Sequence, residues 1–180
     1  MVRVLFSVLV ILALGSSRPT SDSYVSNKYG FAIDFPSEVE IEVSNNYVRS
    51  FTAHELVDES FIMYQVQVLD EQPGYPLEYD TEKEYETFLK GFLASSQFNY
   101  DHTKNLHRRI SLFKNKYYSL DYEFEGVMKP YDLPVSNKGI IILHHKRLKR
   151  VSFIYPQDMS NYPMVQKKYE QFIGSFRLID

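Results

Sequence analysis

The chain has no cysteine and no tryptophan, and only 7 of its 180 residues are glycine. The absence of cysteine excludes disulfide bonds, thiol catalysis, zinc–thiolate sites and iron–sulfur clusters. The few glycines leave little material for glycine-rich phosphate-binding loops. Charge of one sign is not in excess either, since 20 Lys and Arg stand against 23 Asp and Glu, for a formal net charge of −3. This balance is not typical of a dedicated nucleic-acid-binding protein.

Aromatic residues, in contrast, are abundant. The chain has 15 Tyr and 13 Phe, and 44% of its residues are hydrophobic. This composition indicates a folded globular domain and excludes a disordered, low-complexity protein. A single core at this length buries roughly 70% of the surface of the unfolded chain, so no structural metal ion is needed.

Residues 1–15 have the organisation of a secretory signal peptide. Arg3 precedes an apolar run over 4–14, and a small-x-small pattern at its end predicts cleavage. The alternative is a membrane anchor, but the run would cover only about 16 Å of a hydrocarbon core roughly 30 Å thick. We therefore expect a flexible leader over 16–23 and one domain over 24–180. The protein should be exported, periplasmic or secreted after cleavage, and an exported chain without cysteine is more typical of bacteria.

The first third of the domain shows the two-residue period of β-strands. The expected strands cover residues 24–26, 31–36, 39–43, 47–53 and 61–69. Val39 to Val43 alternates apolar and acidic residues, which predicts a half-buried strand. The segment 70–80 contains Pro73, Gly74 and Pro76 and is expected to form an exposed loop.

Two helices are predicted from caps and apolar spacing. In the first, Thr81 and Glu84 are arranged as a capping box, and the apolar residues that follow at helical spacing are Tyr85, Phe88, Leu89, Phe92 and Leu93. In the second, Asn161 is expected to be the N-cap and Pro163 to lie in the first turn, with the helix ending at Gly174. A short last strand is expected over 175–178.

A β-hairpin is predicted directly after the first helix. Both strands can bury the same face only if the loop has an odd number of residues, which places a three-residue loop at 114–116. This register sets Arg109 opposite Asp121 and His107 opposite Glu123. The residues of the first strand that are then expected to face the core are Leu106, Ile110 and Leu112.

A second hairpin, over 138–155, is apolar on both arms. The runs 139–143 and 151–155 have no polar alternation, which indicates strands covered on both faces. Two helices and a large antiparallel sheet predict an α+β fold, an α/β/α sandwich with helices packed on the faces of the sheet.

Two segments of the chain resemble the PsbP-like family, which includes the extrinsic photosystem II subunit and related bacterial exported proteins. They are Tyr29-Gly30-Phe31-Ala32-Ile33-Asp34-Phe35-Pro36 near the start and Phe172-Ile173-Gly174-Ser175-Phe176 near the end. The resemblance extends over nearly all of the mature chain, although Ser37-Glu38-Val39 stands where the family commonly has tryptophan. It implies an antiparallel sheet between helices and an accessory or docking role without catalysis.

Histidine offers little evidence of a metal site. The sequence contains no nucleophile elbow, phosphate-binding loop, zinc-binding helix motif or calcium loop. His144 and His145 are adjacent in a predicted strand, where neighbouring side chains point to opposite faces. We therefore expect no shared metal ion unless the backbone turns between them.

Three carboxylates, Asp121, Glu123 and Glu125, share one face of a predicted strand. They could bind a cation or act as paired acids in glycoside hydrolysis. The expected cross-strand partners Arg109 and His107 explain two of them without a ligand.

The most conspicuous charged feature is a basic cluster at the end of the second hairpin: Lys146, Arg147, Lys149 and Arg150. It should project a positive potential towards an acidic partner protein, anionic lipid headgroups or a polyanion. The alternative is a solvated hairpin end whose charges prevent aggregation. A second candidate surface comprises tyrosines on proline-containing loops, Tyr75, Tyr79 and Tyr131, which could equally pack against the sheet.

These observations predict an exported, non-enzymatic accessory or binding protein. We expect it to dock to another envelope or secreted protein through its basic cluster, with an acidic partner surface favoured and peripheral contact with the envelope left open. No cofactor, catalytic residue, metal site or nucleic-acid partner is expected. The alternative is a small-ligand-binding protein or hydrolase with an aromatic pocket between the sheet and the helix at 85–93.

Overall fold

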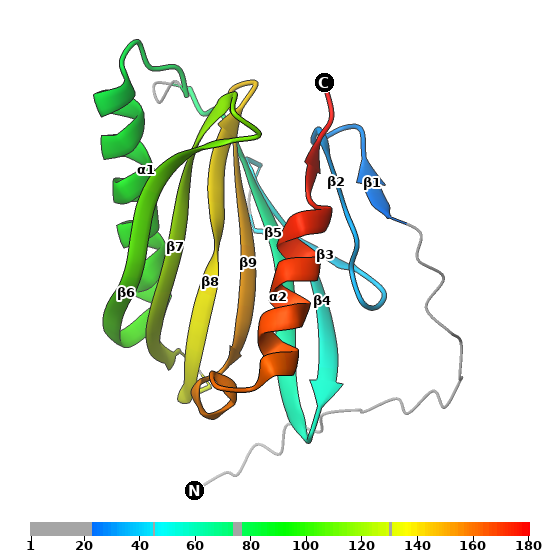
Figure 1. Ribbon diagram of the computed structural model, residues 1–180. Coiled ribbons are helices and arrows are strands. Elements are labelled where there is room, and N and C mark those ends of the chain that lie inside the picture. The colour runs from blue at the N-terminus through cyan, green and yellow to red at the C-terminus, as the bar shows by residue number, and fades with distance from the viewer. Residues whose placement is uncertain (1–22, 45, 74–76, 130) are drawn as a thin grey trace, which may run out of the picture.

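The structure, a computed structural model, describes residues 23–180 apart from 45, 74–76 and 130. Its strands form a three-stranded and a seven-stranded antiparallel sheet, with the orders β1-β2-β10 and β3-β4-β5-β9-β8-β7-β6 (Figure 1). The helices are α1 (Glu82–Ser96) and α2 (Pro163–Ser175), with single 3-10 turns at Gln97–Asn99 and Gln157–Met159. The strands are β1 (Tyr24–Ser26), β2 (Phe31–Ile33), β3 (Glu40–Val43), β4 (Val48–Val57), β5 (Ser60–Asp70), β6 (Tyr100–Phe113), β7 (Tyr117–Met128), β8 (Leu133–His144), β9 (Arg147–Pro156) and β10 (Arg177–Leu178).

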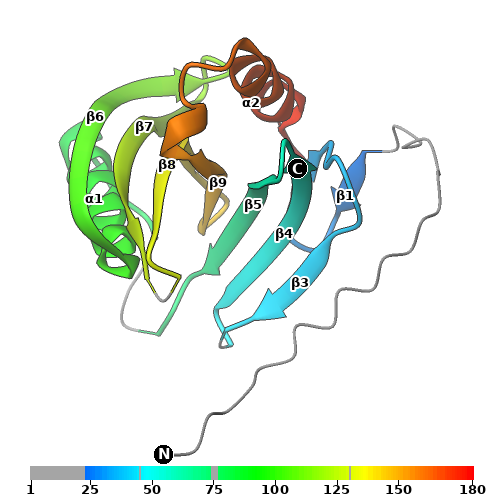
Figure 2. The ribbon, with the colours of Figure 1, turned by 90° about the horizontal axis from the view of Figure 1, so that it is seen from below.

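The two α-helices pack on opposite faces of the large sheet, α1 beside β6 to β8 and α2 beside β9 and β5 (Figures 1 and 2). The core on the α2 face is rich in aromatic residues, among them Phe31, Phe51, Tyr64, Phe153, Phe172 and Phe176. The core on the α1 face includes Leu89, Leu93, Leu120, Tyr122, Phe124 and Ile141. The predicted α+β fold with a helix on each face is confirmed.

Helix α1 begins where the capping box was predicted. Thr81 Oγ1 accepts a hydrogen bond from the backbone N–H of Glu84, and the Glu84 carboxylate accepts one from the Thr81 N–H at 3.0 Å. Hydrogen bonds to its carboxylate from the Thr81 hydroxyl and from the backbone N–H groups of Thr81 and Asp80 lower the pKa of Glu84. Leu89 and Leu93, from the predicted apolar stripe, are fully buried against the sheet. Local sequence therefore determines both the start of this helix and its buried face.

The five strands predicted in the first third all form, although β2 ends at Ile33 and β4 continues to Val57. Strand β3, however, is not half-buried. It lies at the edge of the large sheet beside β4, and its residues are all exposed, including Ile41 at 56% and Val43 at 57%. Alternation of apolar and polar residues creates an apolar face, but none of the described elements covers that face at the sheet edge.

Hairpin β6–β7 has the predicted register near its loop. Phe113 pairs with Tyr117, and Arg109 pairs with Asp121. Further from the loop, two irregularities shift the register of β6. Of the residues expected to face the core, Ile110 packs against it, whereas Leu106 and Leu112 are exposed at 45% and 49%. The expectation for these two leucines is wrong, because β6 is the other edge of the sheet.

Hairpin β8–β9 forms the centre of the large sheet, and its strands are covered on both faces as predicted. Gly139 of β8 lies close to the backbone of the neighbouring strand β9. A Cβ atom at this position would lie 1.9 Å from the carbonyl oxygen of Val151. Only glycine fits there without a shift of the backbone.

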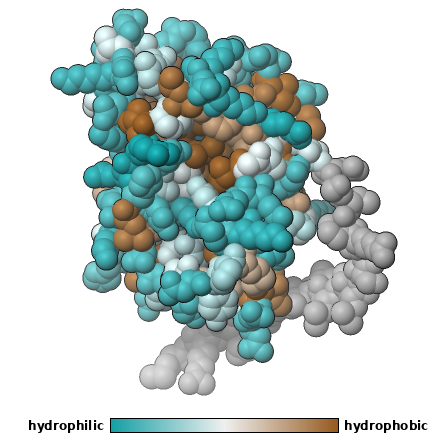
Figure 3. All heavy atoms as spheres, viewed as in Figure 1, coloured by the Kyte–Doolittle hydropathy of each residue, from teal (hydrophilic) through white to brown (hydrophobic). Residues whose placement is uncertain are grey.

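The C-terminal segment packs on the α2 face. Pro163 begins α2 as predicted, but the N-cap is Tyr162 rather than Asn161, and no side chain caps this helix. Strand β10 then joins β2. On this face, hydrophobic side chains gather near the upper ends of the strands, beside the C-terminal segment, and hydrophilic side chains cover much of the rest (Figure 3).

Within the residues that the structure describes, no helix is long and apolar enough to cross a membrane. The predicted signal peptide, residues 1–15, lies outside the described part of the chain, as does nearly all of the predicted leader over 16–23.

Candidate ligand-binding site

The turn between β8 and β9 carries two members of the predicted basic cluster, Lys146 and Arg147. The chain reverses at His145 and Lys146, whose φ angles of 49° and 56° are typical of a two-residue type I′ turn. Lys146 Nζ lies 2.9 Å from a carboxylate oxygen of Glu78. Arg147 Nε donates to Asp70 Oδ1 at 2.7 Å. Neighbouring carboxylates therefore offset much of the positive potential at this end of the hairpin.

The other two members of the cluster, Lys149 and Arg150, are buried, with exposures of 0% and 6%. The prediction of one exposed basic cluster is wrong for these residues. They are neighbours in β9, so their side chains lie on opposite faces of the sheet. Arg150 pairs with Ile141, which belongs to the arm predicted to be covered on both faces. If the predicted pairing of the two apolar arms of this hairpin had been extended by a few residues, it would have placed Arg150 in the interior.

On the α2 face, Lys149 forms a buried pair with His144, and their Nζ and Nδ1 atoms are 3.4 Å apart. Burial and the charge of Arg147 lower the pKa of Lys149 to about 8. Burial and the charge of Lys149 lower the pKa of His144 to about 4. Near neutral pH, therefore, Lys149 carries the charge and donates to a neutral imidazole.

His144 and His145 meet Asp180 beyond the end of β8. The Nε2 atom of each histidine lies 3.2 Å from Asp180 Oδ1, and the three side chains have ligand atoms within 4.8 Å of one another. The expectation that the two histidines point apart is wrong, because β8 ends at His144 and the backbone turns at His145. Imidazole and carboxylate groups suit a divalent metal ion. However, the ammonium group of Lys149 beside His144 disfavours a cation there.

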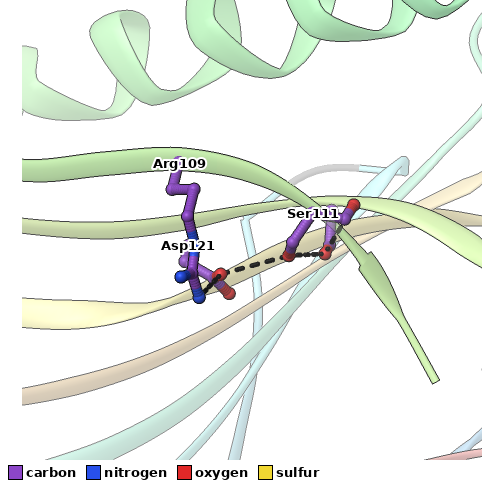
Figure 4. A network of polar contacts seen from close by, with 4 residues as sticks. Arg109, Ser111 and Asp121 are labelled. Atoms are coloured by element: carbon purple, nitrogen blue, oxygen red, sulfur yellow. Dashed lines mark hydrogen bonds and ion pairs between the residues drawn. The ribbon is translucent and has the colours of Figure 1, made fainter. Parts of the chain in front are cut away.

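The predicted acidic strip on β7 is engaged in cross-strand contacts. Asp121 accepts hydrogen bonds from Arg109 at 3.2 Å and from the Ser111 hydroxyl at 3.1 Å (Figure 4). The register also sets His107 opposite Glu123, as predicted. Pairing between β6 and β7 thus gives Asp121 partners and sets a histidine opposite Glu123 without a ligand.

Arg150 lies on the α1 face, within a network of buried polar side chains. Its Nε donates to the Tyr122 hydroxyl at 3.0 Å. The same hydroxyl contacts Ser152 Oγ at 2.7 Å and Asn137 Oδ1 at 3.2 Å, and Asn137 Nδ2 donates to the Tyr100 hydroxyl at 3.0 Å. In the described ranges of the chain, no ion pair joins Arg150 to a carboxylate. The guanidinium is therefore a buried charge whose partners are neutral hydroxyl groups.

This arginine lines a pocket of about 450 Å³ between the C-terminal half of α1 and the sheet. Its charged rim includes Glu42 of β3 and Lys129, but Lys129 is paired with Asp101 at 3.0 Å. The polar uncharged residues around the pocket include Ser50, Gln65, Gln67, Ser95, Ser96, Asn99 and Tyr100. Arg150 is therefore the cation in the pocket that lacks a carboxylate partner among the described residues.

The position of this pocket agrees with the alternative prediction of a pocket between the sheet and the first helix. It lies beside Phe92 to Ser96 rather than beside the start of the helix, and its lining is more polar than expected. The predicted basic cluster placed Arg150 on the wrong surface, and no sequence pattern pointed to Tyr100, Tyr122 and Asn137. The available signal was Ser152, a polar residue inside a run predicted to be covered on both faces, which contacts Tyr122.

An apolar depression of about 570 Å³ adjoins the pocket, and Met63, Met128 and Ile154 line both. Tyr131, one of the predicted recognition tyrosines, lines the depression and is 73% exposed. Tyr79 instead packs against aromatic residues of α1, and Tyr75 lies outside the described residues.

No family profile matches the sequence, and a search of curated proteins found no match. The fold is nevertheless similar to solved structures. Cyanobacterial PsbP (CyanoP) from Synechocystis sp. PCC 6803 superimposes with a TM-score of 0.57 at 13% identity, covering 92% of this chain and 98% of CyanoP. PA94 from Pseudomonas aeruginosa, a putative regulator of unknown function, has a TM-score of 0.50 at 8% identity, covering 83% of this chain and 93% of PA94. The chain therefore has a PsbP-like α+β fold, as its two terminal motifs predicted.

Proposed function

We propose that this protein is a non-catalytic binding protein that holds a small carboxylate ligand in the pocket beside α1. The observation that carries the proposal is Arg150, a buried guanidinium that lines that pocket and has no carboxylate partner among the residues that the structure describes. An unpaired buried charge is costly, and a bound anion would offset that cost.

The network around Arg150 holds the guanidinium in place for such a ligand. Guanidinium has five N–H donors and stays protonated, and the hydroxyls of Tyr122 and Tyr100 are the partners that the structure gives it. The remaining N–H donors can bind a carboxylate in the bidentate geometry that arginine favours. The hydroxyl groups of Ser95 and Ser96 donate to carbonyl oxygens of α1, so the amide groups of Gln67 and Asn99 are the further donors around the pocket.

A carrier role fits the pocket better than catalysis. Its lining residues in the described part of the chain include no histidine, so no imidazole base is placed beside the serine hydroxyls there. A small-ligand carrier is also supported over docking through the basic cluster, because acidic neighbours offset Lys146 and Arg147. Export of the mature chain remains part of the proposal.

The test is an NMR chemical-shift titration with hexanoate and with hexylammonium as the oppositely charged probe. We expect hexanoate to perturb resonances of the pocket and hexylammonium to leave them unchanged. Arg150→Met should weaken hexanoate binding at least tenfold, since a hydrogen bond to a charged group contributes about 1.5–3 kcal/mol. The variant should fold, because the Tyr122 hydroxyl keeps Ser152 and Asn137 as partners.

Arg109→Met is the matched control, because it removes the same group from an exposed position that does not line the pocket. It should bind hexanoate as the wild type does. Equal binding by wild type and Arg150→Met, or no binding of hexanoate by the wild type, would overturn the proposal.

A further inference from the structure

We infer that the carboxylate belongs to a single-chain amphiphile, a fatty-acid-like molecule whose hydrocarbon chain lies in the apolar depression beside the pocket. This inference rests on the proposed function and adds the chemical class of the ligand. Its basis is a groove that is polar and cationic at one end and apolar at the other.

The two parts of the groove are continuous. Met63, Met128 and Ile154 line both the polar pocket and the apolar depression. They come from three different strands, β5, β7 and β9, so the junction is built from the sheet itself rather than from a loop. A ligand bound at Arg150 can therefore extend into the depression over methionine and isoleucine side chains.

The spacing along β9 suits an extended chain. Arg150 and Ile154 lie on the same face of this strand, four residues or about 13 Å apart. Met63 of β5 pairs with Ile154, and Phe61 continues the same face of β5. Between the two ends of the groove, Gln65 Nε2 donates a hydrogen bond to Thr52 Oγ1 of β4, at a distance of 3.4 Å.

The apolar end exposes large side chains to water. Phe61, Leu133 and Tyr131 line it and are exposed at 63%, 42% and 73%. Contiguous apolar surface of this kind, next to a site for a charged group, is typical of a ligand groove. A hydrocarbon chain would remove these side chains from water.

The charges favour a carboxylate over a doubly charged phosphate. Arg150 supplies one positive charge, and Lys129 at the rim is already paired with Asp101. Glu42 adds a negative charge on the opposite rim. A dianion would therefore be only half neutralised and would be repelled by Glu42, whereas a monoanion matches the single guanidinium.

The test compares straight-chain carboxylates from hexanoate to dodecanoate, each below its micelle concentration, by isothermal titration calorimetry. We expect the affinity to rise about twofold to fourfold for each added methylene, because each one leaves water for the apolar groove. Dodecylammonium and dodecyl phosphate should both bind more weakly than dodecanoate.

Phe61→Asp with Leu133→Asp tests the apolar end, and both changes lie at exposed positions that should not affect folding. In this double variant, the affinity should no longer rise with the chain length of the carboxylate, but hexanoate should still bind. Val25→Asp, at an apolar residue of β1 that is 54% exposed and does not line the groove, is the control and should keep that rise in affinity.

The outcomes separate the two proposals. If hexanoate binding depends on Arg150 but affinity does not rise with chain length, the amphiphile inference is wrong and the anion pocket stands. If dodecanoate binds equally well to Arg150→Met, both are wrong. Tighter binding of dodecyl phosphate than of dodecanoate would overturn the choice of a monoanionic carboxylate.

Discussion

Replacement of Lys149 by methionine should stabilise the protein. The lysine side chain is fully buried in β9, on the face that carries α2. Its Nζ atom contacts His144 Nδ1. The charge of Arg147 lowers the pKa of Lys149, and the charge of Asp70 raises it. Methionine has a similar length and no charge, so it removes the buried ammonium while filling most of the same space.

The size of the gain follows from the pKa of Lys149. Burial lowers it from the ordinary 10.5 to about 8, and each pH unit of difference corresponds to about 1.4 kcal/mol. The unfolded state therefore binds the proton more tightly, and folding is penalised by about 3 kcal/mol below pH 8. As pH rises from 8 to 10.5 this penalty disappears. The advantage of Lys149→Met should fall over the same interval.

Urea denaturation at about pH 7 and again above pH 10 measures both the gain in stability and its dependence on pH. We expect a gain of about 2–4 kcal/mol near neutral pH, or a rise in Tm of roughly 5–15 °C for a chain of this size. Lys28→Met, at an exposed lysine, is the matched control and should change stability by no more than about 0.5 kcal/mol. A Lys149→Met variant that gains nothing at neutral pH, or gains the same amount at both pH values, would refute the reasoning.

Three further predictions concern stability. Gly139→Ala should destabilise the protein by about 3 kcal/mol or more in urea denaturation, because the new Cβ would overlap the Val151 carbonyl oxygen; a loss below about 1 kcal/mol would contradict this. Thr81→Ala should cost about 1 kcal/mol by the same measurement, since the capping box is lost, whereas Thr81→Ser should retain most of the stability. His144 has a pKa lowered from 6.5 to about 4, so stability should fall as pH decreases through that interval, and His144→Gln should remove this part of the pH dependence; an unchanged profile would exclude His144 as the cause.

Features governed by neighbouring residues could be predicted from the sequence. The capping box of α1 depends on contacts between Thr81 and Glu84, which are three residues apart. The three-residue loop of hairpin β6–β7 follows because both strands bury the same face only if the loop has an odd number of residues. The apolar runs of β8 and β9 predicted strands at the centre of a sheet, because only a covered strand is apolar on both faces.

Burial at the edges of the sheet could not be predicted in the same way. Ile41 in β3 and Leu112 in β6 belong to correct strand patterns, yet both are exposed. Whether an apolar face is covered depends on where helices and distant strands come to lie, and that arrangement is not encoded in the periodicity of the strand itself.

The sequence by itself determined that positive charges concentrate in residues 146–150 and that strands surround them. The tertiary structure decided what those charges do. Lys146 and Arg147 meet carboxylates near the turn, while Lys149 and Arg150 enter different cores because consecutive residues of a strand face opposite ways. Arg150 lines a pocket only because α1, distant in sequence, lies on its side of the sheet and β5, also distant in sequence, pairs with β9 beside it.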